Sequence, residues 1–154
     1  MFDEIISQSL FFVLTSPFIF WVFSKDIKWL YIGIFVLIPL QIHSLIKIFS
    51  KNYNYEFLKR PPGAANCDLF SRNGNQSGKP GFPSGHMTST VSFITGIYLF
   101  FPDYREWCIN YGIIYIILMA MSRMNKKCHT LIQVIAGSIL GFLSPIILKN
   151  IFIK

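Results

Sequence analysis

Apolar residues gather in five long runs along this chain, over residues 5–24, 29–49, 84–101, 107–122 and 130–149. A helix of roughly twenty apolar residues is long enough to cross the hydrocarbon core of a bilayer. Four of the runs reach or approach that length, and the third does so only if it begins near Ser84. The pattern predicts one all-α domain over residues 1–154, an integral membrane bundle of about five transmembrane helices.

The connections between these runs are unequal. Residues 25–28 and 102–106 are short enough to be tight turns, whereas residues 50–83 form a long polar loop and residues 122–129 a short basic one. In five antiparallel helices, the two polar loops and the N-terminus lie on one membrane face. Four residues are therefore expected to meet there: Arg60, His86, Arg123 and His129.

Composition and charge agree with a membrane protein. Hydrophobic residues make up 53% and charged residues only 14% of the chain, where a soluble domain has about 25% charged residues. The net charge is +7. With so little polar surface, we do not expect a nucleic acid partner; basic residues at a membrane face favour an anionic ligand there. The three cysteines form no CxxC spacing, so a zinc site is not predicted.

Three polar clusters stand at the edges of the apolar runs: Lys59-Arg60-Pro61-Pro62-Gly63-Ala64, Gly81-Phe82-Pro83-Ser84-Gly85-His86, and Ser122-Arg123 followed after five residues by His129. Arg60 and Arg123 can each hold phosphate oxygens with a bidentate guanidinium. Ser84 and Gly85 stand at a predicted helix start, where free N–H groups and the helix dipole favour an anion. The clusters therefore predict a phosphate site.

Two histidines can divide the chemistry of phosphoryl transfer between them. A nucleophilic imidazole must be neutral and needs a partner on its far nitrogen. Gln133 lies four residues after His129, on the same helical face, so we expect Gln133 to orient His129 as the nucleophile. His86 is then the general acid and base. The chain offers no carboxylate cluster for Mg²⁺, and we expect neither a metal nor another cofactor.

These clusters resemble the three signature motifs of the type 2 phosphatidic acid phosphatase superfamily. The family pattern is Lys-x6-Arg-Pro, then Pro-Ser-Gly-His, then Ser-Arg-x5-His-x3-Asp. The resemblance runs from Arg60 to about Gly141 and implies metal-independent hydrolysis of a phosphate ester through a phosphohistidine. It assigns phosphate binding to Arg60, Ser84, Gly85 and Arg123, and catalysis to His86 and His129. The apolar runs exclude the soluble haloperoxidases of this superfamily.

The chain departs from the family pattern at two positions. Tyr53 stands where the family has its lysine, and Lys59 or Lys79 is a candidate substitute. Gln133 stands where most members have aspartate. An amide can accept a hydrogen bond from His129 but cannot stabilise an imidazolium by charge. The stretch from His129 to Gly137 resembles the dolichyl diphosphatase branch, which also carries glutamine here.

The resemblance implies a membrane lipid phosphatase, and we expect a phosphomonoester of the phosphatidic acid type as substrate. Two alternatives stay open: a polyisoprenyl diphosphate phosphatase, and a catalytically weakened protein that binds phospholipids in the bilayer. A small transporter has little support, because the charges lie at one end of the helices.

Three observations bear on which side of the membrane the site faces. Nine of the fourteen Lys and Arg residues lie on the loop side, which by the positive-inside rule favours the cytoplasm. A phosphate site would itself supply many of these charges, however, and family members have a lumenal or extracytoplasmic site. The Asn75-Gln76-Ser77 sequon and the acidic N-terminus agree with the family, so we expect that side.

Three further features carry separate expectations. His43, in the second apolar run, is interpreted as a hydrogen-bonded packing residue more than a functional one. Gly137 and Gly141 predict close helix packing. Cys67 and Cys128 lie on the same predicted side. We favour two free thiols for this pair, with a lumenal disulfide as the alternative, and we expect Cys108 to be a buried apolar residue.

Overall fold

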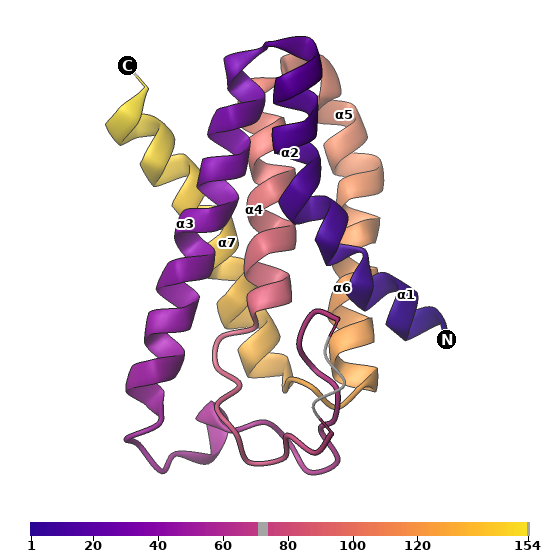
Figure 1. Cartoon of the computed structure of the whole chain (residues 1–154), viewed down its shortest axis with the longest axis vertical. Coiled ribbons are helices and arrows are strands. Elements are labelled where there is room, and N and C mark those ends of the chain that lie inside the picture. Colours follow the sequence, from indigo (N-terminus) through magenta and orange to yellow (C-terminus); the bar gives the residue numbers. More distant parts are fainter. Residues whose placement is uncertain (71–73, 154) are drawn as a thin grey trace.

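The protein is described by a computed structural model covering residues 1–70 and 74–153, and this part of the chain is an α-helical bundle (Figure 1). No named strand occurs in it; pairing is limited to the isolated bridges Lys59–Pro80 and Ala65–Asn75. The all-α prediction is confirmed. The longer helices are α1 (Phe2–Gln8), α2 (Leu10–Ser24), α3 (Ile27–Ser50), α4 (Gly85–Phe100), α6 (Ile113–Asn125) and α7 (Leu131–Phe152). The short elements are η1 (Glu56–Leu58), η2 (Pro102–Tyr104), α5 (Arg105–Trp107) and the π-helical η3 (Cys108–Gly112).

Four helical segments in the described chain are long and apolar enough to cross a membrane: Phe2–Ser24, Ile27–Ser50, Pro102–Asn125 and Leu131–Phe152. The remaining predicted span corresponds to α4, which has only 16 residues and a length of about 24 Å. Most of the residues of α4 are buried, including several Ser and Thr. α4 is therefore the central helix of the bundle, and the longer helices surround it (Figure 1).

Two glycines allow α7 to lie directly against α4. A Cβ atom added at Gly137 would come within 2.4 Å of the Ser84 carbonyl oxygen, and one at Gly141 within 2.4 Å of the Thr88 carbonyl oxygen. Neither position could hold a side chain without moving backbone. The predicted role of the two glycines in close helix packing is confirmed, and this contact fixes the start of α4 beside the start of α7.

The prediction of a tight turn at residues 102–106 is wrong. Its residues are helical in η2 and α5, and they continue through η3 into α6. A proline at the first position of a helix suits the helical backbone, because its missing N–H would have no intrahelical acceptor there. Pro102 therefore begins a helix here, where the sequence analysis expected a turn.

The long loop, the connection between α6 and α7, and α1 lie at the same end of the bundle (Figure 1). α1 is fastened to the last turn of α6: the Ser122 hydroxyl donates to the Asp3 carbonyl oxygen at 2.7 Å, and Lys126 pairs with Glu4 at 2.8 Å. This end of the molecule is where the predicted site residues come together.

A disulfide bond joins Cys67 of the long loop to Cys128, directly before His129. The favoured expectation of two free thiols is wrong. The sequence could not place the two cysteines within bonding distance, because the path of the loop depends on contacts made after folding. Cys108 is a free, buried thiol, as expected.

Candidate active site

A cavity of about 170 Å³ opens among α2, α3, the long loop and the start of α4. A water molecule takes up about 30 Å³ of the liquid, so the cavity has room for a phosphate-sized group. Its apolar part is formed by Leu10, Leu14, Leu40, Cys67 and Leu69. Its polar lining is His43, Lys47, Arg60, Asp68, Gly85, His86 and His129.

His129 precedes α7 and is held by the first turn of that helix. Its Nδ1 lies 3.1 Å from the Gln133 side-chain oxygen. Because an amide oxygen only accepts hydrogen bonds, Nδ1 carries the proton and the lone pair is on Nε2. The Gln133 amide nitrogen donates to the carbonyl oxygens of Phe57 and Lys59, at 3.0 and 2.7 Å. Gln133 therefore fixes both the tautomer of His129 and the loop segment beside Arg60.

The electrostatic surroundings keep His129 neutral. Only 3% of its surface is exposed. Burial, reinforced by the positive charges of Arg123, Lys47 and Arg60, holds the pKa of His129 well below its usual value of 6.5. A neutral imidazole with a free lone pair is the form that can attack phosphorus.

The start of α4 contributes His86, Ser84 and Gly85. Ser84 is the N-cap residue, and its backbone N–H donates to the Gln133 carbonyl oxygen at 2.9 Å. Its hydroxyl oxygen is buried and has no hydrogen-bond partner within the described residues. The first N–H groups of a helix have no intrahelical acceptor. The start of α4 thus presents donors of the kind that bind an anion.

Arg60 is 6% exposed and comes from the long loop. Its Nη2 donates to Asp68 at 3.2 Å, while its buried Nη1 has no hydrogen-bond partner in the described chain. Burial lowers the pKa of Arg60 and the carboxylate of Asp68 opposes that effect, so the guanidinium stays charged. Asp68 also accepts from the Gln76 amide at 2.7 Å, which holds the loop in this conformation.

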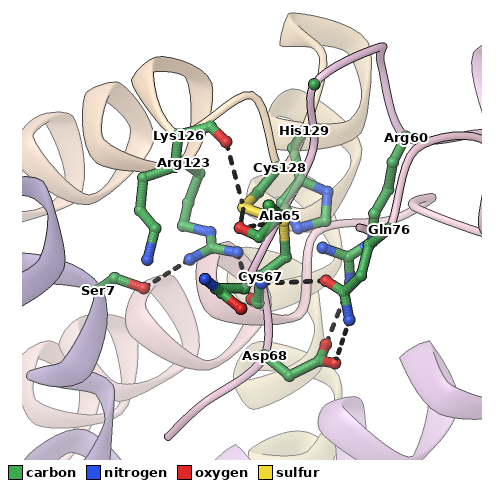
Figure 2. The surroundings of a disulfide bond; sticks show 12 residues. Ser7, Arg60, Ala65, Cys67, Asp68, Gln76, Arg123, Lys126, Cys128 and His129 are labelled. Atoms are coloured by element: carbon green, nitrogen blue, oxygen red, sulfur yellow. Dashed lines mark hydrogen bonds and ion pairs between the residues drawn. A yellow bond between two sulfur atoms is a disulfide. The ribbon is translucent and has the colours of Figure 1, made fainter. Parts of the chain in front are cut away.

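Arg123 is fully buried at the end of α6. Its two terminal nitrogens donate to the Ser7 hydroxyl oxygen and to the Cys67 carbonyl oxygen (Figure 2). Its Nε has no hydrogen-bond partner among the described residues. The Arg123 carbonyl oxygen accepts from the backbone N–H groups of Cys128 and His129. Arg123 therefore ties α1, the long loop and the backbone of His129 together.

Comparison with protein families gives a match to the PAP2 superfamily over residues 28–154. The chain belongs to the PAP2 superfamily. Neither a curated protein nor a solved structure matches the chain. PAP2 membership indicates a phosphatase that acts on phosphate esters. The cavity lined by His86, His129 and the buried Arg60 is in keeping with this, and Arg123 lies outside its lining.

Neither of the expected substitutes for the PAP2 lysine has its side chain in the cavity. Lys59 forms an ion pair with the Glu56 carboxylate at 3.0 Å. The exposed Lys79 contributes only its carbonyl oxygen, which accepts from the Arg60 N–H. Tyr53 is exposed and stacks on Tyr55. Lys47, in the last turns of α3, lines the cavity instead.

His43 also lines the cavity, four residues before Lys47 on α3. Its Nδ1 lies 3.3 Å from the Leu40 carbonyl oxygen, in keeping with the expected hydrogen-bonded role. However, its Nε2 is buried with no hydrogen-bond partner in the described part of the chain, and its ring lies against Gly85. The i, i+4 spacing of His43 and Lys47 was the available signal for a polar face on this helix.

Proposed function

We propose that this PAP2 protein is a membrane lipid phosphatase that hydrolyses a phosphate monoester of the phosphatidic acid type, through a phosphohistidine on His129 and without a metal or cofactor. One observation carries this proposal: a neutral, tautomer-fixed His129 lines the same cavity as Arg60, whose buried Nη1 lacks a partner in the described chain. A nucleophile and unsatisfied cationic donors around one cavity suit an anionic phosphoryl group.

In the first step, the Nε2 lone pair of His129 attacks phosphorus and the bond from phosphorus to the lipid oxygen breaks. His86 gives a proton to that oxygen, which leaves as an alcohol. The Nδ1 proton of His129 stays on its nitrogen, hydrogen-bonded to Gln133. Arg60, Arg123 and the free donors of Ser84 and Gly85 stabilise the charge on the phosphoryl oxygens.

In the second step, water attacks the phosphohistidine. His86, now neutral, takes a proton from the water as its oxygen bonds to phosphorus. The bond between phosphorus and His129 breaks, its electron pair returns to Nε2, and inorganic phosphate leaves. The proton taken from water replaces the one that His86 gave to the alcohol, so both histidines are back in their starting forms.

A lipid diphosphate of the polyisoprenyl type is the second candidate substrate. Lys47 lines the cavity, and its carbonyl oxygen accepts from the Ser50 hydroxyl, but its ammonium group has no hydrogen-bond or ion-pair partner among the described residues. Its positive charge adds to the charges of Arg60 and Arg123, which are assigned to the reacting phosphoryl group. A second phosphate on the substrate would supply the counter-charge that Lys47 lacks. The third candidate, a lipid-binding protein without turnover, has no specific observation in its favour.

Phosphate release by the purified chain tests the proposal. We expect release from phosphatidic acid in mixed micelles, no release with His129→Ala, and a decrease of roughly 10²–10⁴-fold with His86→Ala. Labelled substrate should leave an acid-labile label on the wild type and on His86→Ala but none on His129→Ala. Binding of the lipid without release or labelling would contradict an enzymatic role.

The two substrate classes are separated by Lys47→Met and the matched control Lys51→Met. Lys51 lies one turn further along, outside the catalytic cavity. If the substrate is a diphosphate, Lys47→Met lowers kcat/KM for a polyisoprenyl diphosphate more than for phosphatidic acid, and Lys51→Met lowers neither. Equal decreases for both lipids would assign Lys47 to the reacting phosphoryl group.

The site is proposed to face the lumen or the outside of the cell, with the helices crossing the bilayer. The disulfide between Cys67 and Cys128 supports this side, because disulfides persist in oxidising compartments. Four helical segments of sufficient length and apolar character support the membrane assignment.

A further inference from the structure

Ser7, a residue of α1 outside the three motifs, reaches the centre of the candidate site. Only 3% of its surface is exposed. Its hydroxyl oxygen accepts a hydrogen bond from Arg123 and lies 3.4 Å from Nε2 of His86 (the Arg123 contact is drawn in Figure 2). The Ser7 hydroxyl thus contacts both His86, the proposed general acid, and Arg123, which is proposed to bind the phosphoryl group.

The position of Ser7 is fixed from both sides along the chain. On the N-terminal side, Asp3 and Glu4 bind the last turn of α6 through Ser122 and Lys126. On the C-terminal side, the Ser9 hydroxyl lies 2.6 Å from the Tyr115 hydroxyl. α1 therefore holds the Ser7 oxygen in place without help from a substrate.

We propose that Ser7 is a positioning residue that keeps a proton on Nε2 of His86 and makes Nδ1 the nitrogen that exchanges protons with the substrate. A hydroxyl oxygen has two lone pairs. One accepts from Arg123, and the other is free to accept from an Nε2–H of His86. Nδ1 of His86 has no hydrogen-bond partner among the described residues.

This arrangement works in both halves of the reaction, and it rests on the proposed function. In this proposal His86 enters the first step doubly protonated, a form that the negative charge of the bound phosphoryl group favours. Its Nδ1–H gives the proton to the leaving oxygen as the bond to phosphorus breaks. His86 is then neutral with its remaining proton on Nε2, still donating to Ser7. The Nδ1 lone pair next accepts a proton from the attacking water, which restores the doubly protonated form. Ser7 thus does for His86 what Gln133 does for His129.

The dependence of the rate on the leaving group tests this inference. An alkyl phosphate needs a proton on its leaving oxygen, whereas a nitrophenyl phosphate departs as a stable phenolate and needs none. kcat/KM reports only the steps up to the first bond cleavage. We expect Ser7→Ala to lower kcat/KM for phosphatidic acid by roughly tenfold or more, on the scale of a hydrogen bond to a charged group, and that for 4-nitrophenyl phosphate by less than about threefold.

Two matched variants accompany this measurement. Ser7→Thr keeps the oxygen and should retain the wild-type ratio of the two kcat/KM values. Ser138→Ala removes a hydroxyl of α7 that donates to the Val134 carbonyl oxygen and takes no part in holding Ser7, so it should also retain that ratio. Activity on the aryl substrate serves as the measure of correctly folded protein in each preparation.

Each outcome decides between the inference and its alternatives. An equal decrease for both substrates in Ser7→Ala would mean that Ser7 acts only through Arg123 or the fold. Full activity on both substrates would mean that Ser7 has no role. Either result overturns this inference and leaves the proposed function standing. A wild-type chain that hydrolyses neither substrate overturns the proposed function and this inference with it.

Discussion

Gln133 shows at the scale of a single residue why this site can carry an amide where most relatives are expected to have a carboxylate. Its oxygen accepts from His129 Nδ1, and its nitrogen donates to the carbonyl oxygens of Phe57 and Lys59. A carboxylate could accept the first of these hydrogen bonds but could not donate the other two. The loop segment next to Arg60 is therefore held by a group that only glutamine supplies.

We predict that Gln133→Glu weakens both the fold and the activity. The part-buried carbonyl oxygens of Phe57 and Lys59 would lose their donors, each at a cost of about 0.5–1.5 kcal/mol. The new charge would also favour the imidazolium form of His129 and raise its pKa, so the acidic limb of kcat/KM would move to higher pH. Thermal unfolding and a pH profile measure the two effects.

Asn54→Asp is the control for this substitution, because it makes the same chemical change at an exposed loop position. It should leave the unfolding temperature and the pH profile unchanged. A Gln133→Glu variant with wild-type stability and an unshifted acidic limb would contradict the role assigned to Gln133.

Residue types and spacings predicted the motif residues of the site but not the residues that complete it. His86, His129 and Arg60 line one cavity, as their positions at the edges of the apolar runs indicated. Lys47 and Ser7 were missed. The spacing of Lys47 from His43 was the one signal on an otherwise apolar helix, and nothing in the sequence of α1 indicates that Ser7 packs against the site. The functional roles of all these residues stay predictions.

At the scale of the elements, the contact between α4 and α7 determines the site geometry. α4 carries Ser84, Gly85 and His86, and α7 follows His129 and carries Gln133. The backbone bond from Ser84 to the Gln133 carbonyl oxygen joins the two helix starts. Any change in the distance between the helices therefore moves His86 relative to His129.

We predict that Gly137→Ala destabilises the protein by about 1–3 kcal/mol, the usual range for overpacking, and lowers phosphatase activity more than Gly141→Ala does. Both new methyl groups would meet backbone atoms of α4, but only the first would meet Ser84. Unfolding temperature and kcat/KM of the two variants provide the comparison.

Ser138→Ala, which changes an adjacent residue of α7 bonded only to the Val134 carbonyl oxygen, should alter neither quantity by much. If Gly141→Ala lowered activity as strongly as Gly137→Ala, the effect would be one of overall stability and not of the distance between the helix starts.

Apolar runs predicted the helices well because a lipid environment leaves few alternatives to a helix. They placed the third helix close to the observed bounds of α4, but they did not predict that α4 is central, since its buried Ser and Thr residues do not resemble those of a lipid-facing helix. Nor did they predict the helical segment 102–106 or the break at Ser9 between α1 and α2. These features depend on contacts between helices, which hydropathy does not report.

At the scale of the whole molecule, the disulfide between Cys67 and Cys128 fixes the long loop to the residue before His129. The loop brings Arg60 and Asp68 to the cavity, and its Cys67 carbonyl oxygen binds Arg123. The loop is otherwise held by hydrogen bonds and by short isolated bridges. Within the described chain, the disulfide is thus the one covalent cross-link that holds the long loop, which forms the side of the site not built by helices.

We predict that Cys67→Ser with Cys128→Ser destabilises the protein by about 4 kcal/mol, from the closure of a loop with a sequence separation of 61, and lowers phosphatase activity. A reducing agent should lower the unfolding temperature of the wild type and leave that of the double variant unchanged. Cys108→Ala, which removes the free thiol, should keep the sensitivity to reductant. A wild type indifferent to reductant would contradict a structural role for the bond.

The attachment of α1 to the end of α6 has a practical consequence for producing the protein. Asp3 and Glu4 bind Ser122 and Lys126, so residues at the very start of the chain are part of the same assembly as Arg123. An affinity tag or fluorescent fusion joined directly before Met1 would add bulk where this assembly must close. The end of α7, where Figure 1 marks the C-terminus, lies at the far side of the bundle, and preparations tagged there are the ones in which activity should be sought.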